Sequence, residues 1–348
     1  MTLIVAGPTG ASEHDGGEFH PEQPARIFSV MNGIRALDLE DEVVHVTAPE
    51  AELSDLSRVH SSAYLKELEA FCGRGGGDID PDTYARSDTW SAARRAAGAG
   101  LAAIGALEQR GEGIAFMPVR PPGHHALPDR AMGFCFLNNV AVAAASLTAR
   151  GERVLIVDWD VHHGNGTQAI FWDDPDVLYV STHQYPLFPG TGRADEVGGP
   201  KANGLNVNVP LPAGATGDVV RGALDQVARP TIEEFAPDWV LVSCGFDAHL
   251  ADPLSELALS SGDFAELARV VNEFVPRPGR LALFLEGGYN PAALETSVTA
   301  TLGALLGIAV DPVAPTYGGP GMAGLRATEA HRRRAIEEPD AADLRMDA

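Results

Sequence analysis

Short apolar runs rich in valine, isoleucine and leucine recur along this chain, and longer helical patterns separate them. Several runs are continuously apolar, as are strands that are buried on both faces of a parallel sheet. We therefore predict a mainly parallel sheet of eight strands. The runs are TLIVA (2–6), VVHVT (43–47), IAFMPV (114–119), RVLIVDW (153–159), VLYVST (177–182), LNVNV (205–209), WVLVSC (239–244) and LALFLE (281–286).

Helical candidates lie between these runs, at 88–110, 137–150, 217–236, 261–275 and 290–307. The last begins with Asn290 at the N-cap position and Pro291 at the first helical position. The glycine-rich GRGGGD at 73–78 follows a helix and is interpreted as a loop. This alternation predicts one α/β domain, a doubly wound sheet with helices on both faces.

The composition favours a globular, cytoplasmic protein. Hydrophobic residues make up 45% of the chain, but no apolar stretch approaches the roughly 20 residues of a membrane span, and no signal peptide is visible. Three widely spaced cysteines, Cys72, Cys135 and Cys244, argue against a disulfide framework.

The formal net charge is −23. Such an excess of carboxylates argues against nucleic-acid binding and favours cationic substrates. Solubility alone is an equally good explanation of the acidity. The sequence is compatible with a homo-oligomer but specifies no interface.

Polar clusters follow the predicted strands, where ligands of doubly wound sheets bind. Any one cluster alone would be interpreted as a solvated turn. Five at the same edge of the sheet predict a functional site. The clusters are RPPGHHA, DWDVHHGNG, STHQYPLFPGTG, GFDAHLADP and EGGYN.

The stretch DWDVHHGNG carries the ligand types of a metal site. In an extended segment Asp158, Asp160 and His162 project to one side. An Asp/His set without thiolate suits a catalytic divalent metal. Asp247, just past another strand, offers a further ligand. The alternatives are a hydrogen-bonded Asp/His network and, for Asp247, a turn-forming carboxylate.

Two further clusters offer proton-transfer groups. His124 and His125 lie on a loop stiffened by PPG, where imidazoles beside a metal could take and return protons. Tyr289 follows two glycines and could donate to an oxyanion, although an isolated tyrosine is more often a buried side chain with a satisfied hydroxyl. Together these groups fit metal-assisted hydrolysis of an amide.

As a set, the motifs resemble the histone deacetylase and acetylpolyamine amidohydrolase superfamily, with its arginase-like fold. The matches span residues 20 to 307, and LEGGYN and HHGNG are most similar to the class II branch. The resemblance implies a catalytic domain over 1–310. The segment 311–348 is polar and charge-mixed, so we interpret it as a peripheral part of the same domain, a helix with a frayed end. The motifs are VHSSAYL, RPPGHHA, GFCFLNNVAVAA, VDWDVHHGNGTQAIF, VLYVSTHQYPLFPGTG, VSCGFDAHLADPL and LEGGYN.

The resemblance also implies roles for individual residues. One zinc would be held by Asp160, His162 and Asp247, so only two of the three side chains on the shared face reach it. A structural potassium ion would be bound by Asp158, Ser181 and main-chain carbonyls around Asp160, His162 and Thr182. The O and N ligands tolerate iron(II) or cobalt as well as zinc.

His125 would be the general base and acid, and His124, backed by Asp158, its electrostatic partner. Asn165 would support His125 where many relatives carry aspartate, which lowers its basicity. Tyr289 stands where weakly active relatives carry histidine, so we expect a working catalyst.

Phe134 and Phe188, with Gly133, match the walls of a tunnel that grips the stem of acetyl-lysine in relatives; core packing is the alternative for the two rings. Leu254 occupies a rim position where polyamine-preferring relatives carry an acid. It favours ε-acetyl-lysine in proteins or peptides over acetylated polyamines, while the acidic surface, including the loop with Asp78, Asp80 and Asp82, favours the latter.

Two other readings stay open. A non-catalytic binder of acyl-lysine or metal is disfavoured because the implied catalytic set is intact. Arginase-like hydrolysis is disfavoured because a single metal set is present.

Overall fold

The computed structural model describes residues 1–7, 14–39 and 42–338 of the chain. Its centre is an eight-stranded sheet of order β2-β1-β5-β10-β9-β6-β7-β8, in which every pairing is parallel. The eight predicted strands are confirmed, with ends that shift by no more than two residues. They are β1 (Leu3–Gly7), β2 (Val43–Thr47), β5 (Ile114–Met117), β6 (Val154–Asp158), β7 (Val177–Gln184), β8 (Asn206–Leu211), β9 (Trp239–Cys244) and β10 (Leu281–Leu285).

The predicted helices are confirmed as α4 (Thr89–Arg110), α5 (Asn139–Thr148), the run α7 (Gly217–Gly222), η2 (Ala223–Ala228) and α8 (Arg229–Phe235), α9 (Ser261–Glu273) and α10 (Pro291–Leu306). Asn290 caps α10 by accepting hydrogen bonds from the N–H groups of Ala292 and Ala293. Within the described ranges, no helix has the length and apolar character that a bilayer crossing requires. The helix expected before the glycine-rich segment is α3 (Ser62–Gly73), and the helix expected within 311–348 is α11 (Met322–Glu337), whose expected frayed end includes 339–348, outside the described residues. The structure adds α1 (Ala25–Arg35), α2 (Leu53–Leu56) and α6 (Asn165–Phe171).

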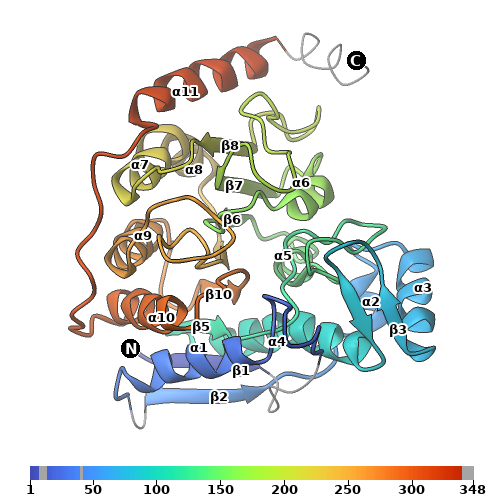
Figure 1. The fold of residues 1–348 in the computed structure, drawn as a ribbon. Helices are drawn as coiled ribbons and strands as arrows, with labels where there is room; N and C mark the ends of the chain where they lie inside the picture. Colours follow the sequence, from blue (N-terminus) through green and yellow to red (C-terminus); the bar gives the residue numbers. More distant parts are fainter. Residues whose placement is uncertain (8–13, 40–41, 339–348) are drawn as a thin grey trace.

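Alternating residues of the strands feed two separate cores. Leu155 and Val157 of β6 belong to one buried cluster, and Val154 and Ile156 belong to the other. Helices α1, α9 and α10 cover the first face, and α4 and α5 cover the second (Figure 1). Because the central strands β6, β9 and β10 are apolar on both faces over most of their length, their polar side chains lie at the strand ends.

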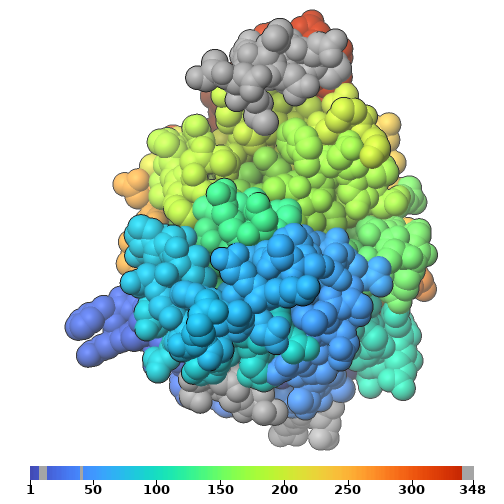
Figure 2. Space-filling view, turned by 90° about the vertical axis from the view of Figure 1, so that its right-hand side faces the viewer, coloured from blue at the N-terminus to red at the C-terminus, as the bar shows by residue number. Residues whose placement is uncertain are grey.

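The loop predicted at 73–78 is wrong in its second half. Gly76–Asp78 forms β3, which pairs antiparallel with β4 (Tyr84–Arg86). Glycine has no side chain that could be apolar or polar, so a glycine-rich strand that is held by backbone pairing shows no alternation in the sequence. This hairpin lies beside α3, on the face that is turned toward the viewer in Figure 2.

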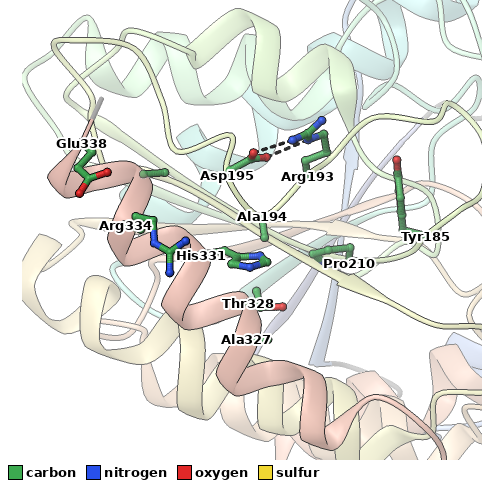
Figure 3. A pocket seen from close by; sticks show the side chains of 11 residues that line it. Tyr185, Arg193, Ala194, Asp195, Pro210, Ala327, Thr328, His331, Arg334 and Glu338 are labelled. Atoms are coloured by element: carbon green, nitrogen blue, oxygen red, sulfur yellow. Dashed lines mark hydrogen bonds and ion pairs between the residues drawn. The ribbon is translucent and has the colours of Figure 1, made fainter. Parts of the chain in front are cut away.

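Helix α11 packs at the β8 edge of the sheet through a buried arginine. Arg332 donates to the carbonyl of Asn206 at 2.6 Å and also to the carbonyl of Gly204. A cavity of about 650 Å³ lies between α11 and the segment after β7 (Figure 3). Its lining carries two arginines and two carboxylates, Arg193, Arg334, Asp195 and Glu338, so it favours neither sign of ligand charge.

Candidate active site

Three predicted ligands meet where β6 and β9 end, on adjacent strands. Asp160 and His162 follow β6, and Asp247 follows β9. One ligand-type atom of each lies within 4.8 Å of the others, and all three residues are buried. His162 Nδ1 lies 3.1 Å from Asp160 Oδ1 and 3.2 Å from Asp247 Oδ2. Residues that are about 85 positions apart therefore form a single cluster, which we call the metal cluster.

Backbone N–H groups fix the two carboxylates of the metal cluster. Val161 N–H donates to Asp247 Oδ1 at 2.9 Å, and Gly287 N–H donates to Asp160 Oδ2 at 2.8 Å. Residue 287 has to be glycine because a Cβ there would lie 1.9 Å from Asp247 Oδ2. The end of β10 thus approaches the cluster as closely as a backbone can.

The metal cluster has a surplus of negative charge. Burial opposes a charge on His162, but its hydrogen bonds to Asp160 and Asp247 outweigh burial and raise its pKa to about 10. A buried pocket that attracts a proton this strongly also attracts a divalent cation. Two carboxylates and one imidazole, with no thiolate, are a donor set that zinc accepts. The residues present therefore fit a catalytic metal.

Asp158 does not join the metal cluster, although it was expected on the same face as Asp160. Its Oδ2 accepts from Tyr179 Oη at 3.0 Å and lies 3.0 Å from His124 Nδ1. Burial opposes a charge on His124, but Asp158 and Asp160 outweigh burial and raise its pKa to about 10. His124 is thus a buried imidazolium.

His125 lies beside His124, with ring centroids 4.0 Å apart. Burial, and then the charge on His124, hold the pKa of His125 well below its usual value, so its ring is neutral. Its Nδ1 lies 2.8 Å from Asn165 Oδ1. Because this oxygen can only accept, Nδ1 carries the hydrogen and Nε2 is free to take a proton.

Tyr289 enters the site from the loop after β10. Its N–H donates to Asp252 Oδ2 at 2.7 Å, and Arg26 Cζ lies 4.9 Å from its ring centroid. Burial raises the pKa of Tyr289 well above its usual value, although Arg26 opposes the shift, so the hydroxyl keeps its hydrogen. The same carboxylate also holds half-buried Leu254, whose N–H donates to Asp252 Oδ1 at 3.0 Å.

Two phenylalanines flank these groups, and we call them the aromatic pair. The Phe134 ring lies 5.8 Å from that of Tyr289, and the Phe188 ring lies 5.1 Å from that of His125. Gly133 packs directly against His125 and Phe188, because a Cβ there would be 2.6 Å from His125 Cδ2 and 2.8 Å from Phe188 Cε1. Neither Phe134 nor Phe188 belongs to the two hydrophobic cores. Because both rings instead lie against the rings of the reactive residues, their positions suit contact with a ligand.

Residues expected around a monovalent cation are also close together. Ser181 is the register partner of Asp158 across the β6–β7 ladder, and Thr182 follows it. All of them are buried. Carboxylate, hydroxyl and carbonyl oxygens are the donors that hard cations prefer.

Sequence reasoning missed Glu286, which ends the β10 run LALFLE. Its Oε2 accepts from Gly123 N–H at 2.7 Å and from His124 N–H at 3.1 Å, and it is fully buried. Burial raises its pKa to about 7, although His124 opposes the shift. An acid at the end of an apolar run is the signal that could have revealed this anchor of the histidine loop.

A second buried charge cluster was also missed, and we call it the arginine cluster. Glu22 is fully buried; Arg120 donates to both of its oxygens, and Arg26 donates to Oε1 at 3.1 Å. Arg26 also donates to the carbonyl of Gly288 at 2.7 Å. These residues lie in HPEQPARI and RPPG, whose charged positions sit among prolines and read as loop polarity.

Comparisons with known proteins place this geometry in a family. The family model for the histone deacetylase domain matches residues 20–305. A histone deacetylase-like amidohydrolase of Pseudomonas aeruginosa is 38% identical over 316 residues, which cover 88% of this chain and 82% of that protein. A probable deacetylase of Methanothermobacter thermautotrophicus is 39% identical over 324 residues, which cover 92% and 95%.

A solved structure agrees with these matches. The crystal structure of the HDA15 HD domain superposes with a TM-score of 0.88 at 32% sequence identity, and the match covers 99% of this chain and 100% of that one. The chain therefore belongs to the histone deacetylase and acetylpolyamine amidohydrolase superfamily, as an amide hydrolase of the deacetylase type with an arginase/deacetylase-like α/β fold.

Proposed function

We propose that this protein is a zinc-dependent deacetylase of ε-acetyl-lysine in proteins or peptides. The observation that carries the proposal is the convergence of the metal cluster, a neutral His125 and a protonated Tyr289 beside the aromatic pair. Each group has the protonation state that amide hydrolysis requires of it.

Asp160, His162 and Asp247 would hold the zinc. When bound, zinc supplies a Lewis acid that polarises the acyl carbonyl and makes the attacking water more acidic. Asp158 and Ser181, with main-chain carbonyls around Asp160, His162 and Thr182, would bind a structural potassium ion behind the cluster.

His125 would accept a proton from the attacking water at Nε2 and then deliver it to the departing amine nitrogen. Asn165 keeps Nδ1 as the donor and so fixes the tautomer. His124, a cation backed by Asp158, stays charged and supports the negative charge that develops on the substrate.

Tyr289 would donate its hydroxyl hydrogen to the tetrahedral oxyanion. Asp252 orients its backbone, and Arg26 packs over its ring, so the hydroxyl is held before substrate arrives. Donors fixed in advance of the reaction stabilise a developing charge without a cost of reorganisation.

The apolar Leu254 supports an acetyl-lysine stem, which carries no second charge near the rim. A second candidate, deacetylation of acetylated polyamines, is favoured by the net charge of −23 and by Asp78, Asp80 and Asp82 near the aromatic pair. Thr83, which follows Asp82, accepts from the N–H of Phe134 at 3.1 Å, so these acids could attract a distal ammonium group.

The test is kcat/KM of the zinc-reconstituted protein on an acetyl-lysine peptide and on N-acetylputrescine, with Tyr289→Phe as the background. We expect a peptide preference of about tenfold or more, about 1.4 kcal/mol of transition-state discrimination. The reverse preference would assign the enzyme to small amines. A protein that binds zinc but hydrolyses neither substrate would be a non-catalytic relative.

A further inference from the structure

His20 joins two segments that flank the aromatic pair. It precedes α1, and its Nδ1 lies 2.9 Å from the backbone oxygen of Glu22. Its Nε2 lies 3.1 Å from the backbone oxygen of Asp82, in the turn between β3 and β4. The ring packs edge-on against Phe134, with centroids 4.8 Å apart. One imidazole thus contacts the N-terminal segment, the hairpin and the aromatic pair.

The two ring nitrogens of His20 face main-chain carbonyl oxygens of two different segments, those of Glu22 and Asp82. A ring that is held at both nitrogens keeps one orientation, and His20 therefore packs against Phe134 in a fixed geometry.

The turn that His20 contacts also holds the backbone of Phe134. Thr83 follows Asp82, its N–H donates to Asp80 Oδ1 at 2.7 Å, and its Oγ1 accepts from Phe134 N–H at 3.1 Å. Phe134 has a φ of +67°, a region that side-chain-bearing residues seldom occupy. Such a conformation persists only where its surroundings enforce it, and His20 and Thr83 are two of the neighbours that do so.

A second link joins the same two segments, because Arg86 Nη1, on β4 of the hairpin, donates to the carbonyl of Asp15 at 2.9 Å. His20 and Arg86 therefore hold the hairpin against the N-terminal segment at two points.

We propose that His20 is a positioning residue which ties the Asp80–Thr83 turn to the N-terminal segment and holds Phe134 in place beside Tyr289. The inference rests on the proposed function, in which Phe134 contacts the acyl-lysine stem. Loss of the His20 ring releases the turn and Phe134, so substrate affinity falls, whereas the reacting groups behind Phe134 are unchanged.

The kinetic test compares KM and kcat for an acetyl-lysine peptide in the wild type, His20→Gln and His45→Gln. His45 is exposed on β2 and serves as the matched control. We expect KM of His20→Gln to be about threefold or more above that of the wild type and of His45→Gln, with kcat unchanged. Equal KM values in all three proteins, or a difference confined to kcat, would overturn the proposal.

Amide hydrogen exchange followed by NMR tests the tie without any activity measurement. The N–H of Phe134 donates to Thr83 Oγ1, and we expect it to exchange faster in His20→Gln than in His45→Gln and the wild type. Equal exchange in all three proteins, in an active enzyme, overturns the tie and leaves the proposed function standing. Faster exchange in His20→Gln alone, in a protein that hydrolyses no acyl-amine, supports the tie and removes the proposed function.

Discussion

Two buried charge clusters meet at Tyr289, and they differ in their balance. The metal cluster gathers two carboxylates around one imidazole, and its field raises the pKa of His162 to about 10. The arginine cluster places Glu22 between Arg120 and Arg26, so the carboxylate has its counterions within the chain. Both clusters act on Tyr289, since Arg26 opposes the rise in its pKa and Asp247 adds to it.

This difference in charge balance explains why one cluster can bind a metal and the other holds the surrounding segments in place. A buried charge that is paired within the chain has no attraction left for a ligand, and it serves to fix the segments that carry it. A buried surplus of negative charge is stable only with a cation, either a proton or a metal. The arginine cluster has an excess of positive charge, and Arg26 directs its remaining N–H groups to the carbonyls of Gly288 and Glu286. The sign of the excess charge therefore distinguishes the cluster that can bind a metal cation from the cluster that supports it.

The largest effect is expected from removing one charge of the metal cluster. Asp247→Asn keeps the shape of the side chain but weakens cation binding, so we expect kcat/KM to fall at least about 10⁴-fold, about 5.5 kcal/mol. Zinc content of the dialysed protein is measured in parallel. Asp252→Asn is the matched control, a buried carboxylate on the same loop that lies outside the cluster, and it should retain zinc. Equal zinc content in both variants would contradict the ligand assignment.

Acid should destabilise the protein through the arginine cluster. Burial opposes ionisation of Glu22, but Arg120 and Arg26 outweigh it and lower the pKa to about 2, from 4.5. Its contribution of about 3 kcal/mol is complete above pH 4.5 and is lost as pH falls toward 2. Burial lowers the pKa of neighbouring His14 to about 4, from 6.5, so protonation of the unfolded chain removes stability between pH 6.5 and 4. Denaturant unfolding at pH 7, 5 and 3 should therefore give a steadily falling free energy of unfolding.

Glu22→Gln tests the same balance at neutral pH. It leaves two buried guanidinium groups without a counterion, which should cost about 3 kcal/mol of unfolding free energy, at the lower end of values for broken buried pairs because the amide oxygen still accepts. The variant should also lose the wild-type slope between pH 4.5 and 2. Unchanged stability would mean that the arginines find other partners. Exposed Glu233 on α8 supplies the control, because Glu233→Gln should leave stability unchanged.

The sequence predicts the metal cluster better than the arginine cluster, for a physical reason. Asp160 and His162 alternate at the end of an apolar strand, so their shared face follows from strand geometry. Glu22 and Arg120 lie in irregular segments without a period, and their meeting depends on how two loops cross. The β3–β4 hairpin also leaves no pattern in the sequence, because Gly76 and Gly77 pair through the backbone alone. Periodicity thus reveals the sheet and its strand ends, but not the loops that complete the site.

Tyr289→Phe should lower the reaction rate without changing the metal cluster or the arginine cluster. It removes one hydroxyl while keeping the ring that packs against Arg26 and Phe134. We expect kcat to fall about a hundredfold, about 2.7 kcal/mol, as for the loss of one oxyanion donor. Zinc content and the free energy of unfolding should match the wild type. A fall in zinc content would mean that Tyr289 supports the metal cluster rather than the reaction.

The smallest effect is expected at the rim, where Leu254→Glu extends the negative surplus of the metal cluster outward. Leu254 is half-buried in the loop that also carries Asp252, so a carboxylate there would meet a substrate before it reaches the reactive groups. A distal ammonium of an acetylated polyamine gains an ionic contact that an acetyl-lysine stem lacks. We expect the ratio of kcat/KM for N-acetylputrescine to that for an acetyl-lysine peptide to rise about tenfold, about 1.4 kcal/mol.

Leu254→Gln is the control for size and polarity, and it should leave the ratio within about twofold of the wild type. Because the gain is ionic, it should shrink as salt is raised from about 0.05 to about 0.5 M. The Debye length is about 10 Å at 0.1 M salt, so these two concentrations screen the contact to a smaller and a larger extent. A ratio that rises equally in both variants, or that ignores salt, would show that the rim selects by shape and that the charge surplus ends at the metal cluster.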